Sequence, residues 1–105
     1  MEEIKVGEYV RTISGNIDKV DALIGMIENT VHLEKHKWQD IKNIVKHSPN
    51  IIDLIEEDDI GIMRYNGLIF KKFITKDDIL ELKFKNYELL EIVTKEQFNQ
   101  VKYEV

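Results

Sequence analysis

The sequence lacks several residue types that enzymes and secreted proteins commonly use. It has no cysteine, which excludes disulfides, zinc–thiolate sites and thiol nucleophiles. Its five scattered glycines cannot form a Gly-rich phosphate loop, and its one proline marks no flexible linker. Serine occurs only at Ser14 and Ser48, and neither lies in the Gly-x-Ser-x-Gly pattern of a hydrolase nucleophile. We therefore expect no enzymatic activity, no catalytic residues and no cofactor.

Long apolar runs and basic leader segments are also missing. No window reaches the length of a membrane span, and Met1 is followed directly by Glu2 and Glu3. We therefore expect a cytoplasmic protein without a membrane partner.

Positive charge is scarce relative to negative charge. The chain has 15 lysines and arginines against 20 acidic residues, for a formal net charge of −5. Residues 53–105 carry 8 basic and 12 acidic groups, so most of the excess lies in the second half. Phosphate-backbone binding relies on clustered lysine and arginine, so nucleic acid is a poor prospect as a partner. Complementary charge instead favours a protein partner with a basic surface.

What the sequence does contain is a series of apolar–polar alternations typical of strands. At 105 residues we expect a single domain, 1–105. Alternation predicts a strand over Ile4–Arg11, bent at Gly7, with Ile4, Val6 and Val10 on one face. The segment 14–16 is a turn signal, which predicts a hairpin returning through residues 17–20.

Later alternations predict the rest of the sheet structure. We expect strands over 30–33, 60–65, 68–74, 79–84 and 87–93, with 79–84 paired to 87–93, and a closing strand over Val101–Val105. Two segments fit either structure: 18–29, where we prefer strand to helix, and 38–45, for which strand and helical turns are equally good.

Two short helices are expected. Ser48 and Pro49 predict one over Pro49–Leu54, because serine caps helices and proline suits the first helical position. The segment Thr94-Lys-Glu-Gln97 is a capping box, which predicts a helix over Lys95–Asn99.

The predicted fold is mainly β, an SH3-like partly open barrel with one or two short helices, and an α+β fold stays open. The opening hairpin has a degraded echo in Ile55–Ile60, which is followed by Tyr65-Asn-Gly67. This echo suggests an internal repeat.

The densest charge cluster is the main candidate partner-binding site. Five acidic residues lie within a segment of seven: Asp53, Glu56, Glu57, Asp58 and Asp59. The spacing matches no calcium loop, and a solvated turn would explain the same residues. The functional alternative is an acidic patch that docks on a basic groove.

Two tyrosines complete the candidate site. Most of the nine aromatic residues are needed for the core of so small a protein. Tyr9 and Tyr65 occupy matching places in the motif and its echo, so we expect them to be exposed. Exposed aromatics anchor protein interfaces more often than they stack on bases.

The histidines give only a weak metal signal. His32 and His36 are four residues apart, a spacing that can place two ligands on one face, and His47 lies further along. A usable site needs a third ligand, so we expect no metal.

Three segments resemble a group of small proteins from phages and prophages of low-GC Gram-positive bacteria. They are Ile4–Val20, Ile44–Ile55 and Ile92–Phe98 with Tyr103–Val105, and the run from His47 to Ile55 is the most specific part. The group continues with Val-Gly-Asp, where this chain has Glu57-Asp58-Asp59, so the glycine of the echo is lost and the turn is more acidic. The resemblance implies a phage setting and carries no established activity.

Together these observations give a leading hypothesis and an alternative. The leading one is a non-enzymatic phage accessory protein that binds and inhibits a host protein, such as a CRISPR or other defence nuclease, through its acidic surface. The alternative is a nucleic-acid-binding module that uses an aromatic face of the barrel. Nothing in the sequence forbids a homo-oligomer that pairs through the Val101–Val105 strand.

Overall fold

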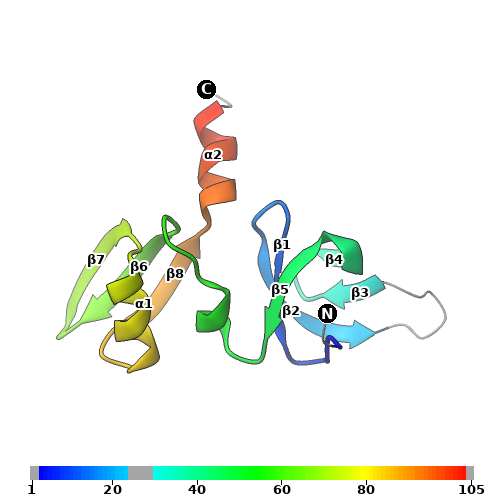
Figure 1. Ribbon diagram of the computed structural model, residues 1–105, viewed down its shortest axis with the longest axis horizontal. Coiled ribbons are helices and arrows are strands. Elements are labelled where there is room, and N and C mark those ends of the chain that lie inside the picture. The colour runs from blue at the N-terminus through cyan, green and yellow to red at the C-terminus, as the bar shows by residue number, and fades with distance from the viewer. Residues whose placement is uncertain (1–2, 24–29, 104–105) are drawn as a thin grey trace. The chain divides into compact units, whose positions relative to one another are not determined.

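A computed structural model describes residues 3–23 and 30–103, with side chains up to residue 100. The chain forms two compact units, Met1–Leu54 and Ile55–Val105, which we call unit 1 and unit 2. Figure 1 shows the strands and helices of each. The expectation of a single folding domain stays a prediction. Neither α-helix in the described part of the chain is long and apolar enough to cross a membrane.

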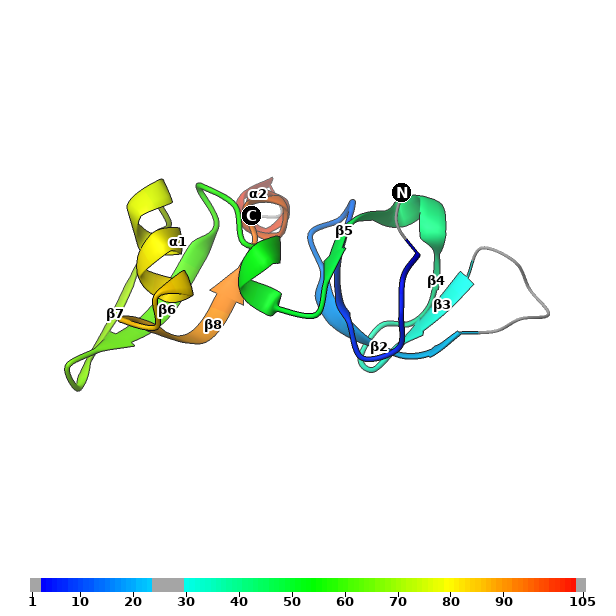
Figure 2. The same ribbon diagram turned by 60° about the horizontal axis from the view of Figure 1, so that its bottom comes forward.

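Unit 1 is a five-stranded antiparallel sheet with the order β4-β3-β2-β1-β5. Its strands are β1 Tyr9–Thr12, β2 Ile17–Leu23, β3 Thr30–Leu33, β4 Lys37–Asp40 and β5 Ile44–Ser48. The 3₁₀ turn η1, Ile41–Asn43, precedes β5, which returns to pair with β1. Over the residues described, the sheet does not close into a barrel, and the mainly β prediction is confirmed (Figures 1 and 2).

Side chains from β1, β2, β3 and β5, together with Ile4 before the first strand, form the core of unit 1. The core residues are Ile4, Val10, Val20, Val31, Leu33 and Ile44. The predicted hairpin is confirmed: Arg11 pairs with Ile17, and the Thr12 N–H donates to the Asn16 carbonyl at 2.9 Å. Gly15 takes a φ of 89°, which a side chain at this position would resist.

The strand predicted over Ile4–Arg11 is shorter than expected. Gly7 has a φ of 93° and forms part of a turn, so β1 begins only at Tyr9. Val6 is therefore 58% exposed instead of lying on the core face with Ile4 and Val10. The glycine is a turn residue here and does not bend a continuous strand.

Both ambiguous segments of unit 1 are mostly extended. Residues 17–23 form β2, in agreement with the preference for strand, and 24–29 lie outside the described residues. Residues 38–45 contain both predicted alternatives, because η1 separates β4 from β5 and the Asp40 side chain caps it by accepting from the Lys42 N–H.

The predicted helix over 49–54 is a short 3₁₀ helix, η2, Ile51–Leu54. The Asn50 side chain accepts from the Ile52 N–H, so asparagine caps it where serine was expected.

Unit 2 contains a three-stranded antiparallel sheet with the order β7-β6-β8. Strands β6, Ile60–Tyr65, and β7, Leu68–Phe73, correspond to the strands predicted over 60–65 and 68–74. They form a hairpin, and Asn66 and Gly67 both take positive φ in its turn. Strand β8, Glu88–Val93, pairs with β6. Unit 2 therefore does not repeat the topology of unit 1, and the echo does not mark a structural duplication.

The strand predicted over 79–84 is wrong. Residues Lys76–Lys83 form helix α1, so β8 has no partner in this segment. Thr75 caps the helix in a capping box with Asp78. The helical spacing buries Leu82 at 1% exposure and leaves Leu80 at 48%, although a strand would have placed both on one face.

The closing strand predicted over Val101–Val105 is also wrong for residues 101–103, which are helical, and residues 104–105 lie outside the described residues. Helix α2 begins at Lys95, as the capping box predicts, and runs to Tyr103. The Thr94 N–H donates to Gln97 Oε1 at 3.1 Å, and the Gln97 N–H donates to Thr94 Oγ1 at 3.3 Å. Because the helix continues through residues 101–103, the proposed dimerisation edge does not exist there.

The two faces of the unit 2 sheet differ in what covers them. Lys72 lies opposite Gly61 and binds Asp78 of α1 at 3.0 Å, so α1 packs on the face that carries Gly61 and the fully buried Met63. Figure 2 shows α1 on this one side of the three strands. Phe73 lies opposite Ile60 and therefore on the other face, which α1 leaves uncovered.

Candidate functional site

The predicted acidic cluster is divided between the two units. Asp53 belongs to unit 1, where its carboxylate accepts a 2.6 Å hydrogen bond from the Ser48 hydroxyl. Residues 56–59 belong to unit 2. The five carboxylates therefore do not form one site within either unit.

Asp59 is a structural residue. Its side chain is completely buried, and its carboxylate accepts from the N–H groups of Glu56 at 2.8 Å and Lys95 at 2.9 Å. It thereby ties the turn before β6 to the start of α2. A buried carboxylate held by two backbone amides cannot contact a partner protein.

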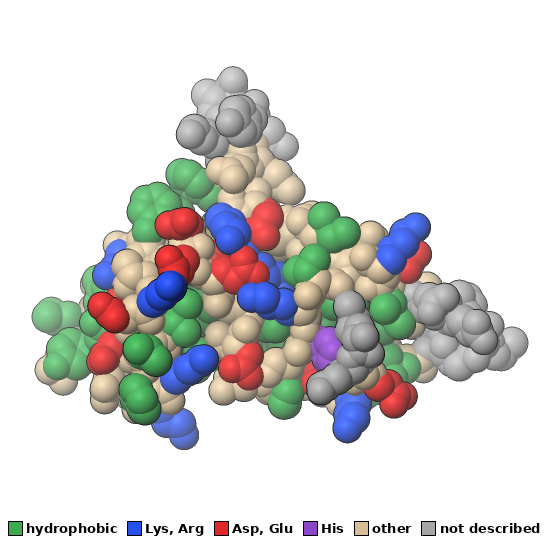
Figure 3. Space-filling view, viewed as in Figure 1, with side chains coloured by type: hydrophobic (Ala, Val, Ile, Leu, Met, Phe, Trp, Pro, Cys, Tyr) green, Lys and Arg blue, Asp and Glu red, His purple; other side chains and the backbone are tan. Residues whose placement is uncertain are grey.

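Two other members of the cluster are bound to lysines. Glu56 pairs with Lys95 at 2.8 Å, and this ion pair raises the pKa of Lys95 above its ordinary value. The Glu57 Oε1 atom lies 3.7 Å from Lys76 Nζ. On the face that Figure 3 shows, the acidic side chains near the base of α2 are interleaved with basic ones.

Asp58 alone among residues 56–59 has a carboxylate without a partner in the described part of the chain. It is exposed, with a φ of 73°, and its N–H donates to the Ile74 carbonyl at 3.0 Å. The backbone of Asp58 is therefore fixed while its charge faces solvent.

Asp58 lines a shallow hollow with two phenylalanines, Lys95 and Asn99. The rings of Phe73 and Phe98 meet edge to face, with centroids 5.9 Å apart and planes at 88°. Phe73 is 55% exposed and Phe98 is 38% exposed. We call this site, lined by Asp58, Phe73, Lys95, Phe98 and Asn99, the aromatic hollow.

The two predicted tyrosines lie in different units and different settings. Tyr9 begins β1 and is half-buried, with Lys19 Nζ 5.8 Å from its ring centroid. Tyr65 ends β6, is 46% exposed and packs edge to face on Tyr87, whose ring also contacts Phe70. They do not occupy equivalent positions, because the units have different topologies. Only Tyr65 belongs to an exposed aromatic cluster.

All three histidines bind carboxylates within unit 1. His32 pairs with Asp21 at 2.5 Å, His36 with Asp18 at 2.8 Å and His47 with Glu8 at 3.1 Å. Among residues 3–23 and 30–100, no group of three His, Cys, Asp or Glu side chains is placed to hold a metal ion. His32 and His36 each bind a different aspartate of β2, so they do not form a shared ligand pair.

Asp18 shows what one of these carboxylates does. It accepts from the N–H groups of Lys35 and His36 at 2.7 and 2.9 Å, which fixes the turn between β3 and β4. Burial alone raises the pKa of Asp18, but hydrogen bonds from the Lys19 amide, the His36 ring and the turn amides outweigh burial and leave the pKa below its ordinary value.

This lowered pKa predicts acid sensitivity of unit 1. A group whose pKa is lower in the folded state stabilises the fold above its unfolded-state pKa, and that contribution is lost as the pH falls through the folded-state pKa. We expect Trp38 fluorescence in urea to report lower stability below about pH 4. Asp18→Asn should lose stability at neutral pH and show a flatter acid dependence. Equal acid dependence in both proteins would contradict this role.

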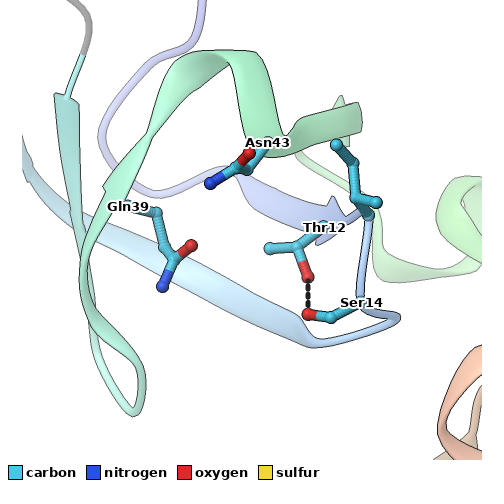
Figure 4. Close-up of a pocket in the computed structure, with 5 residues that line it drawn as sticks. Thr12, Ser14, Gln39 and Asn43 are labelled. Carbon is cyan, nitrogen blue, oxygen red and sulfur yellow. Dashed lines mark hydrogen bonds between the residues drawn. The ribbon is translucent and has the colours of Figure 1, made fainter.

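A second, polar pocket lies in unit 1, at the β1–β2 turn. It is lined by Thr12, Ile13, Ser14, Gln39 and Asn43. Figure 4 shows Gln39 and Asn43 extending into the same space, with Thr12 and Ser14, whose hydroxyls are 3.0 Å apart, on the side opposite Gln39. None of these five side chains is acidic or basic, so this lining provides hydrogen bonds but no general acid or base.

Sequence reasoning included Asp58 but missed the aromatic partners of the hollow. Phe73 and Phe98 were expected in the core with most other aromatics. Their one available signal was the spacing of β7: Phe73 is two residues from Lys71, so both lie on the face away from α1. Comparison of the chain with protein-family models, curated proteins and solved structures finds no match.

Proposed function

We propose that this chain is a non-enzymatic protein-binding module that contacts a partner with a basic surface through unit 2. The aromatic hollow is the observation that carries this proposal. The exposed rings of Phe73 and Phe98 are apolar surface in contact with water, and burying such surface against a partner is favourable. Aromatic residues are also the side chains that most often anchor protein interfaces.

Other exposed apolar side chains of unit 2 support the same function. The β6–β7 hairpin exposes Tyr65, Leu68 at 71% and Ile69 at 61%. Figure 3 shows hydrophobic side chains gathered over this hairpin and beside the lower part of α2. Ile69 lies on the same face of the sheet as Phe73, whereas Tyr65 and Leu68 lie on the face that carries Met63. Exposed apolar side chains with charged residues beside them are typical of protein-interaction sites.

A binding role fits the chemistry of the other candidate sites better than catalysis does. The polar pocket is lined by neutral side chains, and the histidines hold strands and turns together through carboxylates. Neither places a nucleophile, a base and an electrophilic group around one open position.

The resemblance to phage and prophage proteins supplies the setting of the proposal. The partner would be a host protein in the cytoplasm, such as a CRISPR or other defence nuclease. Such enzymes carry basic surfaces for nucleic acid. Binding of unit 2 to a basic surface of this kind would inhibit the enzyme by occupying it.

A capture experiment tests this proposal with one matched pair of variants. The tagged chain is incubated with lysate of a bacterium that encodes it, and bound proteins are quantified by mass spectrometry. Phe73→Ser removes an exposed ring of the hollow, and Val45→Ser changes an apolar residue of similar exposure in unit 1. We expect a protein that the wild type and Val45→Ser retain, that Phe73→Ser loses, and whose retention falls with salt.

Two results would contradict the proposal. One is that no protein is retained selectively, and the other is that Phe73→Ser retains the partner as well as Val45→Ser. Recovery of nucleic acid in place of protein would favour the alternative function, a nucleic-acid-binding module. Thermal unfolding of each variant shows whether the loss reflects binding and not misfolding.

A further inference from the structure

We infer that the aromatic hollow receives an arginine side chain of the partner, with Asp58 as its anionic contact. This inference rests on the proposed function and specifies the chemistry that the site recognises. Of the five carboxylates predicted to contact a partner, it assigns that contact to Asp58 alone.

The rings supply the apolar part of the site. Because Phe73 and Phe98 meet edge to face, the exposed parts of the two rings form two walls nearly perpendicular to each other. A guanidinium group stacks on an aromatic face, and the methylene stem of arginine buries against apolar surface. The same walls would also admit a purely apolar side chain, so the charges must decide between ligands.

The charges around the hollow favour a cation. Lys95 is the lining residue that would repel one, but its ammonium is bound to Glu56 at 2.8 Å. Asp59, which follows Asp58 in the chain, adds a further carboxylate, and this carboxylate accepts from the backbone amides of Glu56 and Lys95. Lys71 lies on the same sheet face as Phe73 but does not line the hollow. Of the two charged residues that line it, Lys95 is paired with Glu56 whereas the Asp58 carboxylate has no partner among the described residues, so the hollow favours a cation over an anion.

Asp58 is held in position for this contact. Its N–H is bound to the Ile74 carbonyl at 3.0 Å, one residue beyond Phe73, so the carboxylate and the first ring are linked through neighbouring backbone. Its carboxylate has no partner in the part of the chain that the structure describes. A carboxylate can accept two parallel hydrogen bonds from a guanidinium, which favours arginine over lysine here.

The test uses the whole chain and a small probe, N-acetyl-arginine amide. Binding is followed by changes in amide chemical shifts in ¹⁵N NMR spectra, with N-acetyl-citrulline amide as an uncharged ligand of the same shape. Asp58→Asn removes the charge and keeps a residue type that tolerates positive φ. Glu34→Gln is the matched control, because it removes an exposed carboxylate from unit 1.

We expect saturable shift changes centred on residues 58, 73, 95, 98 and 99 for the arginine probe. Binding should weaken by about threefold to fivefold in Asp58→Asn, as for an exposed ion pair, and stay unchanged in Glu34→Gln. Citrulline should bind more weakly than arginine. Absence of saturable changes at the hollow, or equal affinity of citrulline and arginine, would overturn the inference. If Phe73→Ser nevertheless loses the captured partner while Asp58→Asn retains it, the proposed function stands and only the arginine assignment fails.

Discussion

Replacement of Asp59 by alanine should lower the free energy of unfolding by about 3 kcal/mol or more, because hydrogen bonds to a buried charged group contribute most among polar contacts. The substitution removes the acceptor of the Glu56 and Lys95 amides and leaves both donors without it. It also disconnects the turn before β6 from the start of α2. Urea unfolding followed by far-ultraviolet circular dichroism measures the loss.

The neighbouring residue provides the control for this prediction. Asp58→Asn changes an exposed side chain whose carboxylate has no hydrogen-bond or ion-pair partner among the described residues, so it should alter stability by no more than about 0.5 kcal/mol. If Asp59→Ala is as mild as Asp58→Asn, Asp59 is not the structural carboxylate that its burial indicates. The same experiment tests whether the chain folds as a single domain. The fluorescence of Trp38, the single tryptophan, reports the unfolding of unit 1. If the chain is a single folding domain, the urea midpoint measured by fluorescence shifts together with the midpoint measured by circular dichroism.

Leu82→Ala should be the second large loss, about 2–5 kcal/mol, as for other buried leucines. Leu82 is 1% exposed on α1, whereas Leu80 on the same helix is 48% exposed. Leu80→Ala should therefore cost far less, within about 0.5 kcal/mol. Both changes have the same small effect on helix propensity, so the difference between them isolates packing. Urea unfolding of the two variants measures it.

This pair also distinguishes the observed helix from the strand that the sequence suggests. In a strand, residues 80 and 82 point to the same face, and the two substitutions would have similar costs. In a helix they lie about 200° apart around the axis, so one is buried and the other exposed. Equal losses for Leu80→Ala and Leu82→Ala would contradict α1.

Sequence reasoning reaches the elements whose turn or cap has a strong local signal. The hairpins at 14–16 and 66–67 follow from residues that tolerate positive φ, and α2 follows from Thr94 and Gln97. Helix α1 was missed for a physical reason. Its capping box uses Asp78 where the common pattern has glutamate or glutamine, while the following residues happen to alternate like a strand.

The bounds of an element are harder to predict than a turn or cap with a strong local signal. Gly7 fits a bent strand as well as a turn, and only the position of Val20, whose carbonyl accepts from the Gly7 N–H at 2.8 Å, decides between them. Residues 101–103 alternate as a strand would, but a helix that has already begun at Lys95 continues by adding one hydrogen bond per residue.

The candidate site is only partly readable from the sequence, because charge density does not reveal pairing. Five neighbouring carboxylates look alike in the sequence, yet Asp59 is buried and Glu56 is bound to Lys95. The contact between Phe73 and Phe98 joins β7 to α2 across 25 residues of chain, and no local pattern predicts it. Tertiary structure is therefore needed to select Asp58 from its neighbours.

The measurement that tests the binding role most directly is the amount of captured partner retained by Phe73→Ser relative to Val45→Ser. The two substitutions remove apolar side chains of similar fractional exposure from different units, so a nonspecific effect of removing an exposed apolar side chain would appear in both variants. If unit 2 binds through the aromatic hollow, Phe73→Ser retains much less partner and Val45→Ser retains as much as the wild type. Equal retention by both variants would contradict the hollow as the binding site.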